Sequence, residues 1–266
     1  MYQHHKESLE NLIRYYRETF DDHESVVAIV FGGSVAKGQE RPDSDIDAMV
    51  ILTPECYERR RAENRLSECV TGYCTYEGGY FDVKFMTKEY LKDAAEKGSE
   101  PTRNAFICAR VVYTTDPEIA ELVPKIPVFQ KGEVAEKMHS FYSALYYDYG
   151  YFWKECKPEG YMRLRTASNI LYDCFRMVLQ ENEILFPCNR RLEEWVAKAP
   201  KKPEGFMELA KRFEETLSDE DCDAFVNAYY NWTTYPHITE GPKIMTRYLA
   251  DMETWWRMPR PQVYEW

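Results

Sequence analysis

The chain has 266 residues, which is long enough for two domains that each bury a hydrophobic core. Its 45 aspartates and glutamates outnumber its 34 lysines and arginines, and the formal net charge is −11 at pH 7. Nucleic-acid binding needs a basic surface, so a nucleic-acid partner is not expected, and a cationic or neutral small molecule, or a partner protein, fits the charge better. The apolar segments are short and the N-terminus is polar, so we expect a cytoplasmic protein without membrane helix or signal segment. Eight scattered cysteines without a CxxC pair predict reduced thiols rather than zinc ligands or disulfides.

The first apolar segment leads into a glycine-rich turn. Residues 26–31, Val-Val-Ala-Ile-Val-Phe, predict a buried strand that ends at Gly32 and Gly33. Ser34 then begins a short helix. Two glycines let the backbone approach an anion, and the helix start adds partial positive charge. With Lys37 nearby the turn is suited to phosphate, although the same residues taken alone also suit a simple turn with a capped helix.

A pair of aspartates opens the second apolar segment. Asp45 and Asp47 flank Ile46 at the start of a strand predicted over 45–52, so both carboxylates point to one face and Ile46 points to the core. Neighbouring carboxylates repel each other, and the arrangement is favourable mainly when a divalent cation neutralises them. Hard oxygen ligands suit Mg²⁺ or Mn²⁺, so the pair predicts a metal site, with an Asx-type turn as the alternative for this segment taken alone.

A third carboxylate lies on a later strand. Apolar residues alternate with Asp82 and Lys84 over 80–86, which puts these two charged side chains on one face. We expect Asp82 to complete the metal site. Lys84 is predicted to reach a triphosphate or to offset the charge of the cluster, and a solvated lysine is the alternative.

These elements together resemble the polymerase-beta-type nucleotidyltransferase superfamily. The resemblance spans residues 25–86 and includes the Gly-Gly-Ser turn, the Asp-Ser-Asp-Ile-Asp segment and the later strand with its aspartate. It implies that Gly33 and Ser34 bind the β- and γ-phosphates, that Asp45 and Asp47 hold two metals, and that Asp82 is the third ligand. Lys37 stands where many members have arginine, which keeps the charge but loses the bidentate fork.

The resemblance also implies an activity. It is the transfer of a nucleoside monophosphate, dependent on Mg²⁺ or Mn²⁺, from a nucleoside triphosphate to a hydroxyl of a small-molecule acceptor, with ATP as the expected donor and pyrophosphate as the product. The first alternative is AMP transfer to a partner protein, but members of that kind are usually compact single domains. The second is a nucleotide-binding regulatory protein without turnover, and the presence of all three carboxylates argues against it.

The remaining pattern predicts an α/β (α+β) N-terminal catalytic domain with a small mixed sheet over residues 1–125. We expect an amphipathic helix at 8–16, a charged helix over 55–70, a hairpin over 73–86, a helix over 88–97 and a strand at 110–113. Two prolines within 123–128 interrupt regular structure and predict the domain boundary.

Helical periodicity dominates residues 126–266 and predicts an all-α helical-bundle domain. Long helices are expected over 133–156 and 161–184, and shorter ones over 191–199, 206–217, 219–230 and 243–256. Aromatic residues are concentrated over 141–153, with Asp148 among them. We expect most of these rings to pack in the core and one or two to stack on a base or an acceptor ring.

Overall fold

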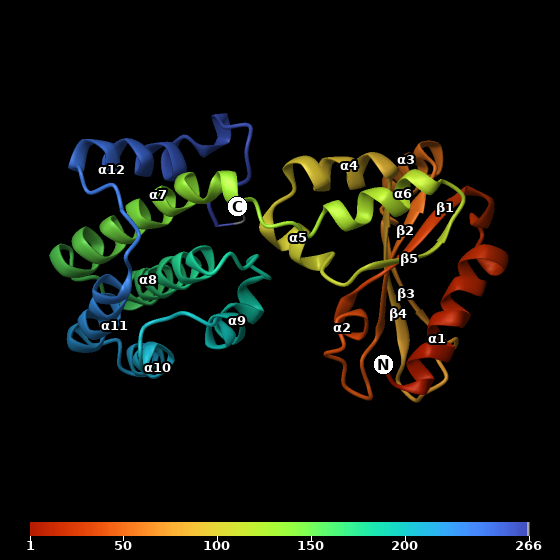
Figure 1. Ribbon diagram of the computed structural model, residues 1–266, viewed down its shortest axis with the longest axis horizontal. Coiled ribbons are helices and arrows are strands. Elements are labelled where there is room, and N and C mark those ends of the chain that lie inside the picture. Colours follow the sequence, from red (N-terminus) through yellow and green to blue (C-terminus); the bar gives the residue numbers. More distant parts are fainter. Residues whose placement is uncertain (265) are drawn as a thin grey trace. The chain divides into compact units, whose positions relative to one another are not determined.

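The computed structural model describes residues 1–264 and 266 (Figure 1). The chain divides into two compact units, Met1–Val128 and Phe129–Trp266. The domain limits predicted from the sequence are 1–125 and 126–266, and independent folding of these two parts stays a prediction. Within the described residues, every helix is too short or too polar to traverse a lipid bilayer.

A five-stranded mixed sheet organises the first unit. Its strands are β1 Val26–Phe31, β2 Ile46–Leu52, β3 Ser67–Thr71, β4 Tyr80–Met86 and β5 Arg110–Thr114, in the spatial order β3-β4-β2-β1-β5. The central pair β2 and β4 is parallel, and the other pairs are antiparallel. The predicted mixed sheet is therefore confirmed.

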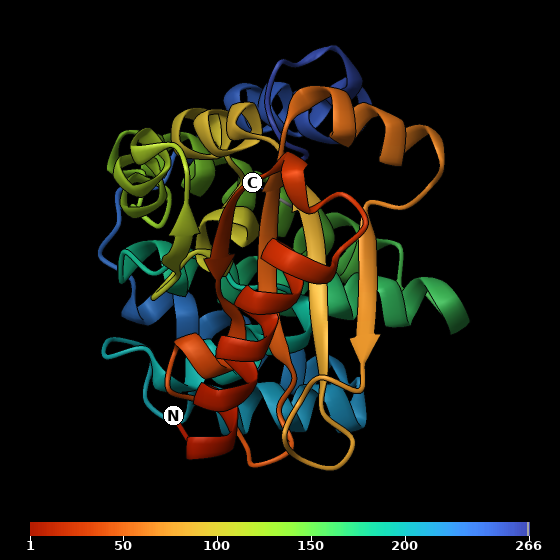
Figure 2. The ribbon, with the colours of Figure 1, turned by 90° about the vertical axis from the view of Figure 1, so that its right-hand side faces the viewer.

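Helices cover both faces of this sheet because the strands alternate their apolar side chains between the faces. The helices are α1 Gln3–Arg14, α2 Gly33–Ala36, α3 Pro54–Ala62, α4 Lys88–Lys97, α5 Glu100–Ala105 and α6 Pro117–Leu122. Figure 2 shows α1 lying across one face, where Leu12 packs in a cluster with Phe31 and Val50. On the other face Leu91 and Ile119 pack in a cluster with Ala28, Val30 and Ile51. Burial of these residues on both faces holds the strand ends, and hence the site, in place.

The charged helix predicted over 55–70 is wrong beyond Ala62. Helix α3 ends there because Asn64 adopts a left-handed conformation with φ of 58°, and β3 follows. Ser67–Thr71 alternates between exposed and half-buried residues, as expected for an edge strand. The predicted hairpin over 73–86 is corrected accordingly, because its first strand lies before residue 73 and residues 72–79 form its loop.

The second unit is all-helical, as predicted. Helix α7 Val134–Leu145 continues through a π-helical segment, Tyr146–Glu155, and is followed by α8 Gly160–Glu181. The shorter helices are α9 Leu192–Lys198, α10 Phe206–Thr216, α11 Asp219–Trp232 and α12 Gly241–Tyr248, and a second π-helical segment, Leu249–Glu253, follows α12. Helix α8 contributes Ile170, Cys174, Met177 and Val178 to the core of this unit, and each is fully buried.

Candidate functional site

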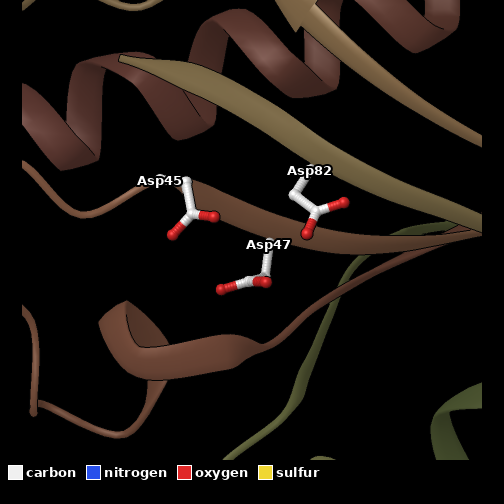
Figure 3. Close-up of side chains that lie close together, drawn as sticks. All are labelled: Asp45, Asp47 and Asp82. Carbon is white, nitrogen blue, oxygen red and sulfur yellow. The ribbon is translucent and has the colours of Figure 1, made fainter. Parts of the chain in front are cut away.

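Three aspartates converge at the start of the parallel strand pair. Asp45 directly precedes β2, Asp47 is the second residue of β2, and Asp82 lies on β4. The parallel register places Asp47 opposite Asp82. One carboxylate oxygen from each residue lies within 4.8 Å of the others, and Figure 3 shows the three side chains reaching into the same space. Opposite ligands of one Mg²⁺ are about 4.2 Å apart, so the spread of these oxygens is close to what a divalent cation requires.

The charges in this cluster are poorly compensated by the protein. Burial is the largest cause that raises the pKa of Asp47, the negative charges of Asp45 and Asp82 add to it, and the resulting pKa is about 6. The Lys84 charge and a hydrogen bond from the Ser34 backbone N–H lower the pKa of Asp47, but these effects are smaller. A bound cation would replace this repulsion by attraction, so the residues present fit a divalent metal.

The glycine-rich turn packs directly against the central aspartate. The Gly32 N–H donates to the Asp47 carbonyl oxygen at 3.1 Å. Gly33 has a φ of +70°, and a Cβ atom at this residue would lie 1.7 Å from the Asp47 Oδ2 atom. A side chain at residue 33 is therefore incompatible with the observed position of the Asp47 carboxylate. The turn predicted to bind phosphate and the predicted metal ligands thus form one site.

The two predicted lysines are placed differently. Lys84 lies on β4 with its side chain exposed, and its charge acts on Asp47. The Lys37 ammonium group donates to the backbone carbonyl and to the side-chain Oδ1 of Asn104, each at 3.1 Å. Asn104 is buried on α5, so Lys37 ties the end of the α2 turn to that helix. Contact of either lysine with a phosphate stays a prediction.

Two tyrosines that the sequence analysis did not single out support the first aspartate. The Tyr80 hydroxyl hydrogen-bonds to Asp45, and the charge of Asp45 raises the pKa of Tyr80. The Tyr76 hydroxyl donates to the carbonyl oxygen of Ser44, the residue before Asp45. The alternation of β4 carried a signal for Tyr80, because it lies two residues before Asp82 and shares its face. Tyr76 lies in the loop between β3 and β4, where periodicity gives no such signal.

Comparison with known proteins finds a family match over the residues that form this site. Residues 13–106 match the sequence profile of the nucleotidyltransferase domain family. A crystal structure of a nucleotidyltransferase-like protein from Exiguobacterium sibiricum 255-15 is similar with 9% sequence identity and a TM-score of 0.43, over 97% of this chain and 81% of that one. A search of curated proteins found no match. The matched residues include the glycine turn, the three aspartates and strands β1 to β4. Residues 13–106 therefore form a nucleotidyltransferase domain, in agreement with the resemblance that the motifs of this segment carry.

Proposed function

We propose that the protein transfers a nucleoside monophosphate from a nucleoside triphosphate to a hydroxyl of a small-molecule acceptor and releases pyrophosphate. ATP is the proposed donor and Mg²⁺ or Mn²⁺ the proposed metal. The observation that carries the proposal is the convergence of Asp45, Asp47 and Asp82, whose ligand oxygens lie within 4.8 Å of one another. Nucleotidyl transfer requires this kind of oxygen cluster, since the reaction develops negative charge at the phosphate and at both its attacking and leaving oxygens.

The three aspartates lie in different surroundings, so each has a different proposed role in metal binding. Asp45, directly before β2, and Asp47, on β2, would share the metals, while Asp82 on β4 would hold the metal beside the acceptor hydroxyl. A bound divalent metal would supply Lewis acidity, lowering the pKa of the acceptor hydroxyl and neutralising the triphosphate. The hydrogen bond from Tyr80 restrains Asp45, and burial restrains Asp47. Such restraint holds the ligand oxygens in place before substrate binds.

The glycine turn and Lys84 would manage the triphosphate. Because Gly33 has no side chain, the backbone of residues 33 and 34 can lie beside the aspartates without displacing them. The backbone N–H groups of this turn would then meet oxygen atoms of the β- and γ-phosphates beside the aspartates. The exposed ammonium of Lys84 adds a positive charge on the same face as Asp82, where leaving pyrophosphate accumulates negative charge.

The net charge of the protein is the basis for the proposed class of acceptor. A net charge of −11 disfavours a nucleic acid and favours a cationic or neutral small molecule. All eight cysteines are free, which agrees with the proposed cytoplasmic location, where thiols stay reduced.

Radiolabel transfer from α-labelled ATP tests the proposal. The full chain is incubated with Mg²⁺ and the small-molecule fraction of a cell extract, and we expect a labelled small product and pyrophosphate. Asp82→Asn should abolish the label. Asp43→Asn is the matched control, since Asp43 is exposed and paired with Arg41, and should retain activity. A parallel incubation with the protein fraction of the extract tests the alternatives. Label on a protein there would favour the partner-protein alternative, and nucleotide binding without transfer in either incubation would favour the regulatory one.

A further inference from the structure

The second unit contains a cavity of about 450 Å³ that the nucleotidyl-transfer chemistry does not use. This volume lies within the range of about 300 to 1,000 Å³ that is typical of small-molecule sites. All residues that line it belong to Phe129–Trp266, and they come from the π-helical segment Tyr146–Glu155, the start of α8, the end of α12 and the C-terminal residues that follow. The cavity is thus complete within one compact unit.

Asp148 is a buried carboxylate of this cavity that has no ion pair among the described residues. Its side chain lines the cavity although the residue is only 5% exposed. Among residues 1–264 and 266, the hydrogen bond that it receives comes from the Asn169 side-chain amide at 3.3 Å. An ionised carboxylate can accept about four hydrogen bonds, so most of its capacity is unused. Burial accordingly raises the pKa of Asp148 to about 7.

The other charged groups around the cavity differ from Asp148. Asp251 is also buried, but Arg247 at 3.0 Å and Arg260 both pair with it. Arg165 and Glu253 are exposed residues of opposite charge, so they lie where the lining meets solvent. Arg165 lowers the pKa of Asp148 through its charge, but its Nη1 atom donates a hydrogen bond to the Tyr161 hydroxyl at 3.4 Å. A ligand entering the cavity therefore meets one buried carboxylate, that of Asp148, which lacks a close cationic partner in the part of the chain that the structure describes.

The rest of the lining is largely aromatic and apolar. Phe152, Tyr248 and Trp255 contribute rings, and Met162 and Met252 contribute flexible thioether side chains. Aromatic faces attract organic cations by cation–π interaction, and they also bury apolar surface of a ligand. An anionic ligand would be repelled by Asp148, and a ligand without a donor would leave this carboxylate unsatisfied.

We propose that this cavity binds a small organic molecule carrying a protonated amine, with the amine at Asp148 and the apolar body against Phe152, Tyr248 and Trp255. The ammonium group supplies the hydrogen bonds and the charge that Asp148 lacks. Binding at this site needs neither metal nor nucleotide. Amine binding can therefore be tested separately from the nucleotidyl-transfer reaction.

The test is a calorimetric or NMR titration of the full chain at pH 8 with matched probes. Phenethylamine carries the ammonium group, phenethyl alcohol has the same shape without the charge, and phenylacetate has the opposite charge. We expect the amine to bind about ten- to a hundredfold more tightly than the alcohol, and phenylacetate not to bind. Asp148→Asn should remove this preference, whereas Glu220→Gln, an exposed carboxylate outside the cavity lining, should keep it.

A second variant checks the position of the probe. Trp255 is 44% exposed, so Trp255→Ala should fold normally and should weaken binding of the amine several-fold. Equal affinity for amine and alcohol, absence of saturable amine binding, or an unchanged preference in Asp148→Asn would overturn the proposal.

Discussion

Replacing Gly33 by alanine tests whether the phosphate turn and the metal ligands are one packed unit. The substitution forces a side chain onto a backbone with φ of +70°, which costs about 1–2 kcal/mol. The new Cβ would also lie 1.7 Å from Oδ2, 2.3 Å from Cγ and 2.6 Å from Cβ of Asp47. Relieving such overlap typically costs a further 1–3 kcal/mol. We therefore expect Gly33→Ala to lower the free energy of unfolding by about 2–5 kcal/mol.

Gly38 offers a matched control in the same segment. Its φ is +67°, but no heavy atom lies within 4 Å of a Cβ built there. Gly38→Ala should therefore show the conformational cost alone, about 1–2 kcal/mol. Chemical denaturation in EDTA measures both variants without metal. The difference between them isolates the contact with Asp47.

Activity provides a second measurement. The Asp47 carboxylate must move to accommodate the new methyl group, and a displacement of about 1 Å at a catalytic group can cost about a hundredfold in rate. We expect this loss of nucleotide transfer in Gly33→Ala and near-parent turnover in folded Gly38→Ala.

A double-mutant cycle identifies the atoms responsible. In an Asp47→Gly background the three nearest atoms are gone, so Gly33→Ala should cost no more stability than Gly38→Ala does in the parent. Equal losses of stability for the two alanine variants in the parent protein would refute the inferred close approach.

Three further predictions concern charge. Asp47→Ala should lower nucleotide transfer at least about a thousandfold and yet raise the melting temperature in EDTA above pH 6, where ionised Asp47 is repelled by its neighbours; unchanged turnover would contradict its role as a ligand. Asp173 is fully buried, neither of its carboxylate oxygens has a hydrogen-bond partner among the described residues, and burial raises its pKa well above the usual value. The stabilising contribution of protonated Asp173 is therefore complete below about pH 4, and it falls by about 1.4 kcal/mol per pH unit as the pH rises toward the folded-state pKa. Asp173→Asn should flatten a plot of unfolding free energy against pH, and a plot parallel to that of the parent protein would contradict this. Lys84→Ala should raise the Michaelis constant for the triphosphate more than that for the acceptor, and kinetics within about twofold of the parent for both would exclude Lys84 from the chemistry.

The sequence predicted those elements whose pattern is local. Strand β1 and helix α4 have the predicted bounds, because a continuous apolar run and a threonine-capped amphipathic segment determine them without distant contacts. Strand β3 was missed because its stability comes from distant residues. Glu68 on this strand accepts hydrogen bonds from Tyr16 and from Arg60, which lie on other elements. In the sequence, Glu68 continues the charged pattern of the preceding helix, so the predicted helix extended to residue 70.

The candidate site divides in the same way. Asp45, Asp47 and Asp82 could be found from period-two alternation, which places carboxylates on one face of a strand. The pairing of Lys37 with Asn104 could not be found, because α2 and α5 are separated by three strands and meet only after the sheet forms. The cavity beside Asp148 could not be found either. Its lining comes from residues more than 100 positions apart, and the aromatic run around Asp148 predicted mainly core packing.

The pairing of β2 with β4 explains why the fold and the site are assembled by the same interactions. A slip of one residue in β4 would turn Asp82 into the core and bring Phe81 and Val83 to the site, because strand side chains alternate with period two. Phe81 and Val83 are fully buried, and exposing each would cost about 1.5–3 kcal/mol. The hydrophobic core therefore selects the register that sets Asp82 opposite Asp47, against the mutual repulsion of their carboxylates. The acidic cluster is held together by apolar burial on the opposite face of the strand, which is why it can exist before any cation arrives.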